Sequence, residues 1–293
     1  MEGRSIQQHL HSQSLKLKPR AESKLARLFT NLMFQGNTKA AIRLLTENGQ
    51  GEVLKLDEVA SDGRTVLEIL KSKHPSPHPC SASALLHPDL DPPEIHPVAY
   101  EAIDARCIRT AALHTFGAGG PSGTDTARWR RLCTSFKKAS DELCHSIALV
   151  TKKICSSFVD PQSLSPLLAC RLVALPKNPG VRPIGICEVV RRINTKAVIS
   201  ITRLDILEAV GSHQLCAGHI AGVEAAIHAI RSSFSSDSVE GVLLVDASNA
   251  FNSLNRSVAL HNIQHVCPIL APFLINSYRN PSNLFVGGTS IMS

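Results

Sequence analysis

One short stretch of the chain places a carboxylate and an aromatic ring close together. In GVLLVDASNAFNSLN, residues 241–255, four apolar residues lead into Asp246, and Phe251 follows five positions later. A carboxylate at the end of a predicted strand, beside the main-chain carbonyl of Ala247, offers the oxygen ligands that Mg²⁺ prefers. The ring of Phe251, one turn further on, could lie under a sugar. Two simpler interpretations stay open: Asp246 as the N-cap of the next helix, and Phe251 as a core residue.

Basic residues gather in an earlier stretch, where residues 171–196 hold six lysines and arginines and a single acid, Glu188. Apolar runs on both sides of Asn178-Pro179-Gly180 predict a two-stranded hairpin with Lys177 and Arg182 on its arms. Such rigid presentation suits a polyphosphate, which arginine contacts bidentately and lysine as a point charge. A solvated basic hairpin is the alternative. The six basic residues are Arg171, Lys177, Arg182, Arg191, Arg192 and Lys196.

The elements that must position these residues are mostly helical. A basic, polar lead through Arg20 is predicted to be disordered. Helical spacing then predicts a helical hairpin over residues 22–48 and a short helix after the turn at Asp62-Gly63. The stretch 74–97 carries seven prolines, which predicts a linker or a draped loop. Further along we expect helices over 98–115, 129–158, 188–210, 222–234, 257–265 and 269–278, a Gly-rich loop at 116–125, a strand at 242–246 and a hairpin turning at Gly287-Gly288. This is an α+β layout.

Composition limits the class of protein. The chain has 293 residues, 43% of them hydrophobic, and a formal net charge of +7, which favours anionic partners such as nucleic acid. No apolar run is long enough for a membrane span, and the N-terminal segment has no apolar region of a secretory signal. Nine cysteines stand singly, without a C-x-x-C pair, which indicates reduced thiols in an intracellular protein, cytoplasmic or nuclear.

The order of these motifs resembles a known family. LVALPKNPGVRPIGI (172–186), followed along the chain by VDASNAF (245–251), resembles the fingers and palm opening of reverse transcriptases, most of all those of retrotransposons without long terminal repeats. GAGGPSGTD (117–125) is similar to the A-x-G-P-[DS]-G loop of that family, and HQLCAGHIAGVEAAIHAI (213–230) stands where the family has its Q-x-G-F-R segment. The resemblance covers roughly residues 98–293.

The resemblance implies a right-hand polymerase fold that is incomplete. Residues 1–97 would form an N-terminal helical or disordered region with the Pro-rich linker. Residues 98–240 would form the fingers, and residues 241–293 the first part of the palm. The family uses Mg²⁺, deoxynucleoside triphosphates, an RNA template and a DNA primer, so the same cofactor and partners are implied here, with no membrane partner.

The resemblance also implies roles at the site. Asp246 matches the first metal-binding aspartate, with Ala247 supplying a carbonyl ligand. Arg182 matches the arginine that holds the β- and γ-phosphates of the nucleotide, and Lys177 a neighbouring lysine.

Four further positions follow from the same match. Phe251 matches the gate that excludes a 2′-hydroxyl, and Ala250 lies where the backbone approaches the sugar. Gln214 and Gly218 match template-side positions, although the family's Phe-Arg pair has no counterpart in Ala217-Gly218-His219.

One element of the family pattern is missing. Two-metal nucleotidyl transfer needs several carboxylates, and this sequence contains no two consecutive aspartates and no Gln-Gly segment after the hairpin. We therefore expect an N-terminal piece of a reverse transcriptase that is catalytically incomplete by itself. A non-catalytic module that binds RNA or DNA is the alternative from another functional class, and an expressed remnant that does not fold is the third possibility.

Overall fold

The structure is a computed structural model, and it divides into two compact units. The first comprises residues 1–53 with 175–179, and the second residues 54–174 with 180–293. The lead through Arg20 that was expected to be disordered and the template-side Gly218 lie outside the described residues. The expected domain boundaries at residues 97 and 240 stay predictions. The structure describes residues 21–38, 41–42, 53–76, 79–212, 214–215, 221–235 and 239–293.

In the first unit, helical spacing correctly predicts a helix, α2 (Ala21–Phe34). Its side chains include Leu28, Met33 and Phe34, all of which are substantially exposed. The second helix of the expected hairpin, around Ile42 and Leu45, lies mostly outside the described residues.

Four strands form a mixed sheet in the order β2-β1-β3-β4. The hairpins predicted at Asn178-Pro179-Gly180 and at Gly287-Gly288 are confirmed, and both glycines of the second turn have positive φ, which a two-residue hairpin turn favours. β3 also runs parallel to β1, with Cys170 opposite Leu284 and Arg171 opposite Phe285, a pairing that the sequence did not predict. The strands are β1 (Cys170–Pro176), β2 (Val181–Cys187), β3 (Asn283–Val286) and β4 (Thr289–Met292).

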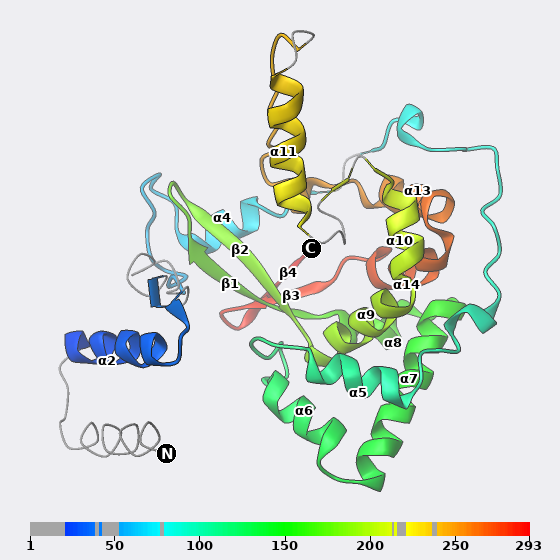
Figure 1. Cartoon of the computed structure of the whole chain (residues 1–293), viewed down its shortest axis with the longest axis horizontal. Coiled ribbons are helices and arrows are strands. Elements are labelled where there is room, and N and C mark those ends of the chain that lie inside the picture. Colours follow the sequence, from blue (N-terminus) through cyan, green and yellow to red (C-terminus); the bar gives the residue numbers. More distant parts are fainter. Residues whose placement is uncertain are drawn as a thin grey trace. The chain divides into compact units, whose positions relative to one another are not determined.

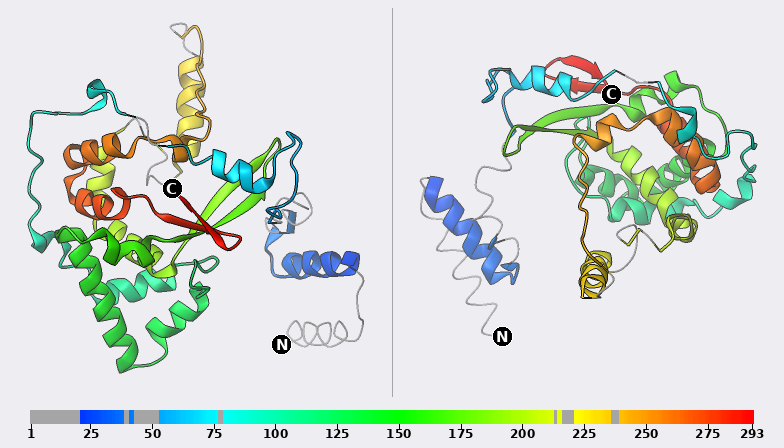
Figure 2. Two further views of the ribbon diagram at one scale, coloured as in Figure 1. Left: turned by 180° about the vertical axis from the view of Figure 1, so that it is seen from behind. Right: turned by 90° about the horizontal axis from the view of Figure 1, so that it is seen from above.

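One short helix, α4 (Val66–Ser72), packs on this sheet (Figures 1 and 2). Its residues Val66, Ile69 and Leu70 form one core with the inward side chains of β1 and β3. The helix begins with a capping box, because the Thr65 hydroxyl accepts from the Glu68 backbone N–H at 3.2 Å and the Glu68 carboxylate accepts from the Thr65 N–H at 2.8 Å. The short helix predicted after the turn at Asp62-Gly63 is thus confirmed.

Replacing Thr65 with alanine should lower the free energy of unfolding by about 1 kcal/mol, because the Glu68 backbone N–H loses the hydroxyl to which it donates. Thr65→Ser keeps the hydroxyl and is the matched control. The measurement is urea denaturation followed by circular dichroism. If the alanine and serine variants are equally stable, the capping box contributes nothing.

The larger core lies among the helices. Its centre is formed by Ile108 of α5, Ile147 of α7, Leu164 of α8, Ile193 of α9 and Phe273 of α14, all nearly inaccessible. The helices are α5 (Ala105–Leu113), α6 (Thr126–Thr134), α7 (Lys138–Ser156), α8 (Pro161–Leu168), α9 (Val189–Ile201), α10 (Arg203–Val210), α11 (Gly222–Phe234), α12 (Ala250–Ser253), α13 (Arg256–Val266) and α14 (Ala271–Tyr278), with 3₁₀ turns η1 (Ala82–Ala84), η2 (Pro97–Tyr100) and η3 (Pro268–Leu270).

Aspartate N-caps fix where several of these helices begin. The side chains of Asp104, Asp125 and Asp160 each accept a hydrogen bond from a backbone N–H in the first turn of α5, α6 and α8. The single helix expected over 129–158 is instead two helices, because the chain breaks before α7 at Lys137, whose φ is +48°. The architecture is therefore α+β, as predicted. No helix of the described residues is long and apolar enough to cross a membrane.

The strand expected over 242–246 is wrong. Residues 239–247 carry no regular structure, and they pair with neither edge of the sheet. Leu243 is 86% exposed, and Leu244 and Val245 are each 84% exposed. A strand needs a neighbour for its backbone N–H and C=O groups, and no described strand supplies one here. The apolar pattern therefore predicted a strand where the described residues provide no partner that would bury it.

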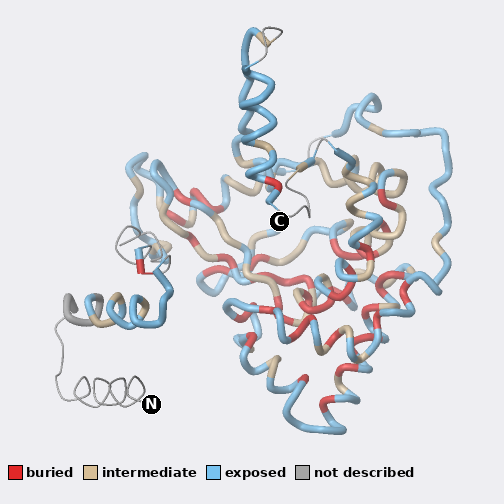
Figure 3. Tube along the Cα trace, viewed as in Figure 1, coloured by how far each residue is buried: buried red, intermediate tan, exposed pale blue. Residues whose placement is uncertain are grey.

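Helix α11 confirms the prediction for residues 222–234 but leaves its apolar face uncovered. Val223, Ile227, Ile230 and Phe234 recur at helical spacing, and each is about half exposed or more. Figure 3 shows this helix exposed along most of its length.

Candidate functional site

The segment that carries the candidate metal ligand lies on the surface. Asp246 and Ala247 are exposed within the irregular stretch before α12. Asn249 follows with a left-handed backbone, φ +53°, and donates a hydrogen bond to the Lys73 carbonyl at 3.0 Å. Ala250 begins α12 and is exposed, and Phe251 is 100% exposed. The core interpretation of Phe251 is thus wrong, and the aromatic ring is available to a ligand.

Asp246 does not act as an N-cap either. The residue at the N-cap position of α12 is Asn249, and no side-chain capping bond is made there. Among the described residues, no hydrogen bond or ion pair involves the Asp246 carboxylate. The simpler structural interpretation of this aspartate therefore lacks support, while its exposure leaves it free to meet an ion or a ligand.

The described residues provide limited oxygen donors for Mg²⁺ at this place. Within them, no group of three or more His, Cys, Asp or Glu side chains is arranged to hold a metal ion. No aspartate or glutamate follows Asp246 in the 293 residues. Asp246 and the Ala247 carbonyl could supply two ligands to one ion, but a two-ion centre needs further carboxylates.

The Gly-rich loop, residues 117–125, is docked against the end of β2 and the start of α9. The buried Glu188 carboxylate accepts two hydrogen bonds from Ser122, one from the backbone N–H at 2.7 Å and one from the hydroxyl at 2.8 Å. A Cβ on Gly120 would lie 2.7 Å from the Glu188 nitrogen and 2.8 Å from the Cys187 carbonyl carbon. Only glycine allows this approach, so the loop sequence and the acid at position 188 are matched.

Two arginines also hold the Gly-rich loop in place through hydrogen bonds to its backbone carbonyls. Arg192 donates to the Phe116 carbonyl at 2.9 Å and to the Ala118 carbonyl, and Arg171 donates to the Gly119 carbonyl at 3.1 Å. Each guanidinium therefore satisfies loop carbonyls that have no helix or sheet partner.

Replacing Gly120 with alanine should lower the free energy of unfolding by about 1–3 kcal/mol, because the added methyl group meets rigid backbone atoms. Gly241→Ala is the matched control, since nothing lies within 4 Å of a Cβ there and its φ is not positive. Chemical denaturation of both variants measures the difference. Equal stability of the two variants would show that the loop is not docked as described.

The basic cluster of residues 171–196 divides into two groups. Four of its six cations donate to internal carbonyls: Arg171 and Arg192 to the Gly-rich loop, Arg191 to Leu168, and Lys196 to His114. In the described part of the chain, Lys177 and Arg182 make no such bond, and both are exposed. The sequence showed the charge of this cluster but not this division, which leaves Lys177 and Arg182 as the cations available to a phosphate.

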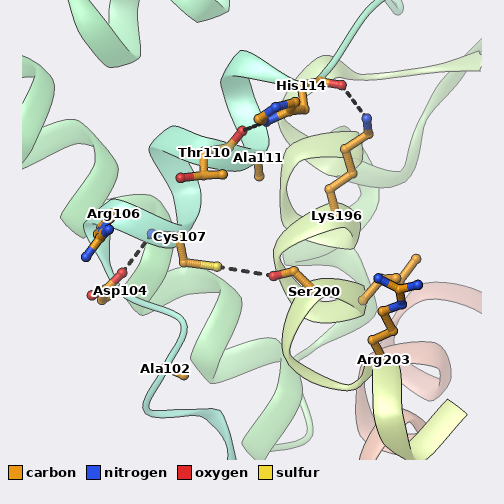
Figure 4. A pocket seen from close by; sticks show the side chains of 11 residues that line it. Ala102, Asp104, Arg106, Cys107, Thr110, Ala111, His114, Lys196, Ser200 and Arg203 are labelled. Carbon is orange, nitrogen blue, oxygen red and sulfur yellow. Dashed lines mark hydrogen bonds between the residues drawn. The ribbon is translucent and has the colours of Figure 1, made fainter. Parts of the chain in front are cut away.

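A cavity of about 600 Å³ between α5 and α9 was not anticipated (Figure 4). Arg106, Lys196, Arg203 and His114 line it. Its one lining carboxylate, Asp104, already accepts a hydrogen bond from the α5 backbone. The lining therefore carries more positive than negative charge, which favours an anionic ligand. No spacing rule would have revealed it, because its residues come from helices about 90 positions apart.

The structure does not bring the expected site residues together by direct contact. No hydrogen bond or ion pair among the described residues joins Asp246 to Arg182 or to Lys177. Gln214 is described and exposed, whereas its expected companion Gly218 is among the undescribed residues. The template-side assignment therefore stays a prediction.

Comparison with known proteins does not assign a family. No protein-family model matches the chain. No curated protein is significantly similar to it in sequence.

Proposed function

We propose that this chain is a reverse-transcriptase-like domain that contacts nucleotide and nucleic acid but does not complete nucleotidyl transfer by itself. The observation that supports the proposal most is that one motif segment of the resemblance packs against residues that flank another. Through Gly120 and Ser122, the Gly-rich loop 117–125 contacts Cys187 and Glu188, which directly follow the hairpin stretch 172–186. Arg171, which directly precedes that stretch, donates to the Gly119 carbonyl.

The exposed cations fit the nucleotide role. Arg182 lies near the start of β2 and Lys177 directly after β1, and neither is used internally. In the proposal, Arg182 contacts the β- and γ-phosphates of a deoxynucleoside triphosphate and Lys177 adds positive charge nearby. Phe251, fully exposed, excludes a 2′-hydroxyl, and Ala250 leaves room for the sugar.

The acidic part of the site supports binding more than catalysis. Asp246 and the Ala247 carbonyl would hold one Mg²⁺ together with the phosphates of the nucleotide. That ion would neutralise phosphate charge and orient the nucleotide. Transfer of the nucleotide to a primer requires more carboxylates than the described residues place there.

The second candidate is a non-catalytic module that binds RNA or DNA. The cationic cavity between α5 and α9 favours it, because Arg106 and Arg203 offer positive charge without any need for a metal. Such binding would be independent of sequence and would weaken steeply with salt.

A binding titration with a labelled RNA–DNA primer–template, competed by single-stranded RNA, separates the two candidates. The reverse-transcriptase-like domain should prefer the primer–template and bind it more tightly when the next complementary deoxynucleotide and Mg²⁺ are added. The non-catalytic module should bind both nucleic acids alike and ignore the nucleotide. Absence of binding even at about 50 mM salt would contradict both. Primer extension by this chain alone would contradict catalytic incompleteness.

A further inference from the structure

Two cysteines at the open end of the β1–β2 hairpin face each other. Cys170 begins β1 and Cys187 ends β2. The Cys170 thiol donates a hydrogen bond to the Cys187 sulfur across a Sγ–Sγ distance of 3.3 Å. A disulfide bond is about 2.05 Å long, so the sulfurs lie within about 1.3 Å of bonding distance.

A buried arginine lies beside this pair. The Arg191 guanidinium donates to the Leu168 carbonyl at 3.0 Å and lies 3.8 Å from the Cys170 sulfur and 3.7 Å from the Cys187 sulfur. The Arg191 guanidinium carbon also lies over the Tyr278 ring, 5.3 Å from the ring centroid. No carboxylate in the described part of the chain is within ion-pair distance of Arg191. Because a buried cation is costly without an anion, a thiolate here would supply the missing counter-charge.

The thiols of Cys170 and Cys187 differ in pKa and in exposure, and this difference indicates which of them reacts first. The hydrogen bond from Cys170, together with the positive charges of Arg191 and Arg192, lowers the pKa of Cys187 although burial acts in the opposite direction. Donating that hydrogen bond raises the pKa of Cys170. Cys187 is also the more exposed of the two. Cys187 is thus the thiol that can react first, with Cys170 placed behind it.

Three other thiols in the described part of the chain lack this environment. Cys133, Cys144 and Cys155 are inaccessible to solvent. Burial raises the pKa of Cys133 and raises that of Cys155 to about 12, so neither carries thiolate near neutral pH. These residues provide internal controls within the same molecule.

We propose that Cys170 and Cys187 form a peroxide-reactive dithiol site that closes to a disulfide. The Cys187 thiolate attacks one oxygen of hydrogen peroxide, the O–O bond breaks, and the released hydroxide takes up a proton to become water. Cys187 is thereby oxidised to a sulfenic acid. The Cys170 sulfur then loses its proton and attacks the Cys187 sulfur, the S–O bond breaks, and a second water leaves. In sum, two thiols and one peroxide give one disulfide and two waters.

This site is independent of the proposed nucleic-acid function, since none of its residues is assigned to nucleotide or template. A disulfide here would join the start of β1 to the end of β2. That position lies next to Gly120 and the docked Gly-rich loop.

The test is mass spectrometry of the reduced full chain after brief exposure to hydrogen peroxide, alkylation of the remaining thiols and digestion with trypsin. Cleavage after Lys and Arg, but not between Arg182 and Pro183, places Cys170 in peptide 154–171 and Cys187 in peptide 178–191. We expect these two peptides to become cross-linked, with fragment ions assigning the bond to Cys170 rather than Cys155. Oxidation of Cys187 should be at least about tenfold faster than that of Cys133, because a thiol with a pKa one unit lower or more carries about tenfold more thiolate.

Two variants test the assigned order. In Cys170→Ser, oxidation should stop at a sulfenic acid on Cys187, which dimedone traps. In Cys187→Ser, neither a cross-link nor a trapped sulfenic acid at Cys170 should form, whereas the matched control Cys133→Ser should cross-link like the wild type. The proposal is overturned if wild-type peptides 154–171 and 178–191 stay unlinked, or if Cys187 reacts no faster than Cys133.

Discussion

Replacing Asn276 with alanine should lower the free energy of unfolding by about 3 kcal/mol or more, because this one side chain makes four hydrogen bonds in the core. Its Nδ2 donates to the carbonyls of Ile154 and Ser157, each at 2.7 Å. Its Oδ1 accepts from the Val159 backbone N–H and from Arg279, each at 3.1 Å. An amide side chain has two donor hydrogens and two acceptor lone pairs, so the capacity of Asn276 is fully used.

The position of Asn276 explains why the loss should be large. α7 ends at Ser156, and the last carbonyls of a helix have no partner within the helix. Asn276, on α14 and only 3% exposed, supplies partners for carbonyls at this end. Alanine would leave the buried Ile154 carbonyl and the partly buried Ser157 carbonyl without this hydrogen bond, which costs about 1–3 kcal/mol for each unsatisfied group.

Chemical denaturation of Asn276→Ala and of the matched control Asn262→Ala measures this effect. Asn262 also donates and accepts, to the Ala84 carbonyl and from the Leu86 N–H, but it is partly exposed. We expect the control to lose only about 1 kcal/mol, since water can replace its partners. If the two variants are destabilised equally, Asn276 does not hold α7 and α14 together as described.

The parts of the fold that the sequence predicted are those set by local chemistry. The turns at Asn178-Pro179-Gly180 and Gly287-Gly288 follow from residues that favour turn geometry, and both hairpins formed. The short helix predicted after the turn at Asp62-Gly63 also formed, and its start is fixed locally by the Thr65–Glu68 capping box, which was not predicted from the sequence. The two turns and the short helix need no distant partner, so a short window of sequence is sufficient to predict them.

The parts that the sequence did not predict depend on distant partners. β1 pairs with β3 across more than 100 residues, and Glu188 finds Ser122 66 residues away. No periodicity specifies such contacts. The segment 242–246 is the reverse case, because its apolar residues indicate a strand but its conformation depends on a neighbouring strand that the described residues do not provide.

The sequence indicated which residue types the candidate site contains, but it only partly indicated which of them are exposed and which are bound internally. The sequence indicated a basic cluster at 171–196, but charge alone cannot distinguish an arginine that satisfies carbonyls from one that faces solvent. Arg192, for example, is bound to the Gly-rich loop, whereas Arg182 is exposed.

Replacing both Lys177 and Arg182 with alanine should reduce the salt dependence of nucleic-acid binding by about two units of slope in a plot of log K against log salt. Without a bound nucleotide, we expect these two exposed cations to contact backbone phosphates of the primer–template. Each lysine or arginine that contacts such a phosphate releases about one counterion on binding, so each lost contact removes about 0.9 from the slope. Both side chains are exposed and neither is hydrogen-bonded in the described part of the chain, so the fold should be retained. The measurement is fluorescence anisotropy with a labelled RNA–DNA primer–template between about 50 and 200 mM salt.

The matched control removes the same charge elsewhere. Arg128→Ala with Lys138→Ala neutralises two exposed cations on α6 and α7, and Lys138 contributes only a weak pair with Glu142 at 3.7 Å on the surface. If binding depends on the hairpin cations, the control should change the slope by far less than the Lys177/Arg182 double variant. Equal changes in the two variants would mean that nucleic-acid binding depends on net charge alone, and it would contradict a specific phosphate contact by Lys177 and Arg182. A slope unaffected by either variant would instead direct attention to the cavity cations Arg106 and Arg203, which the same titration can test.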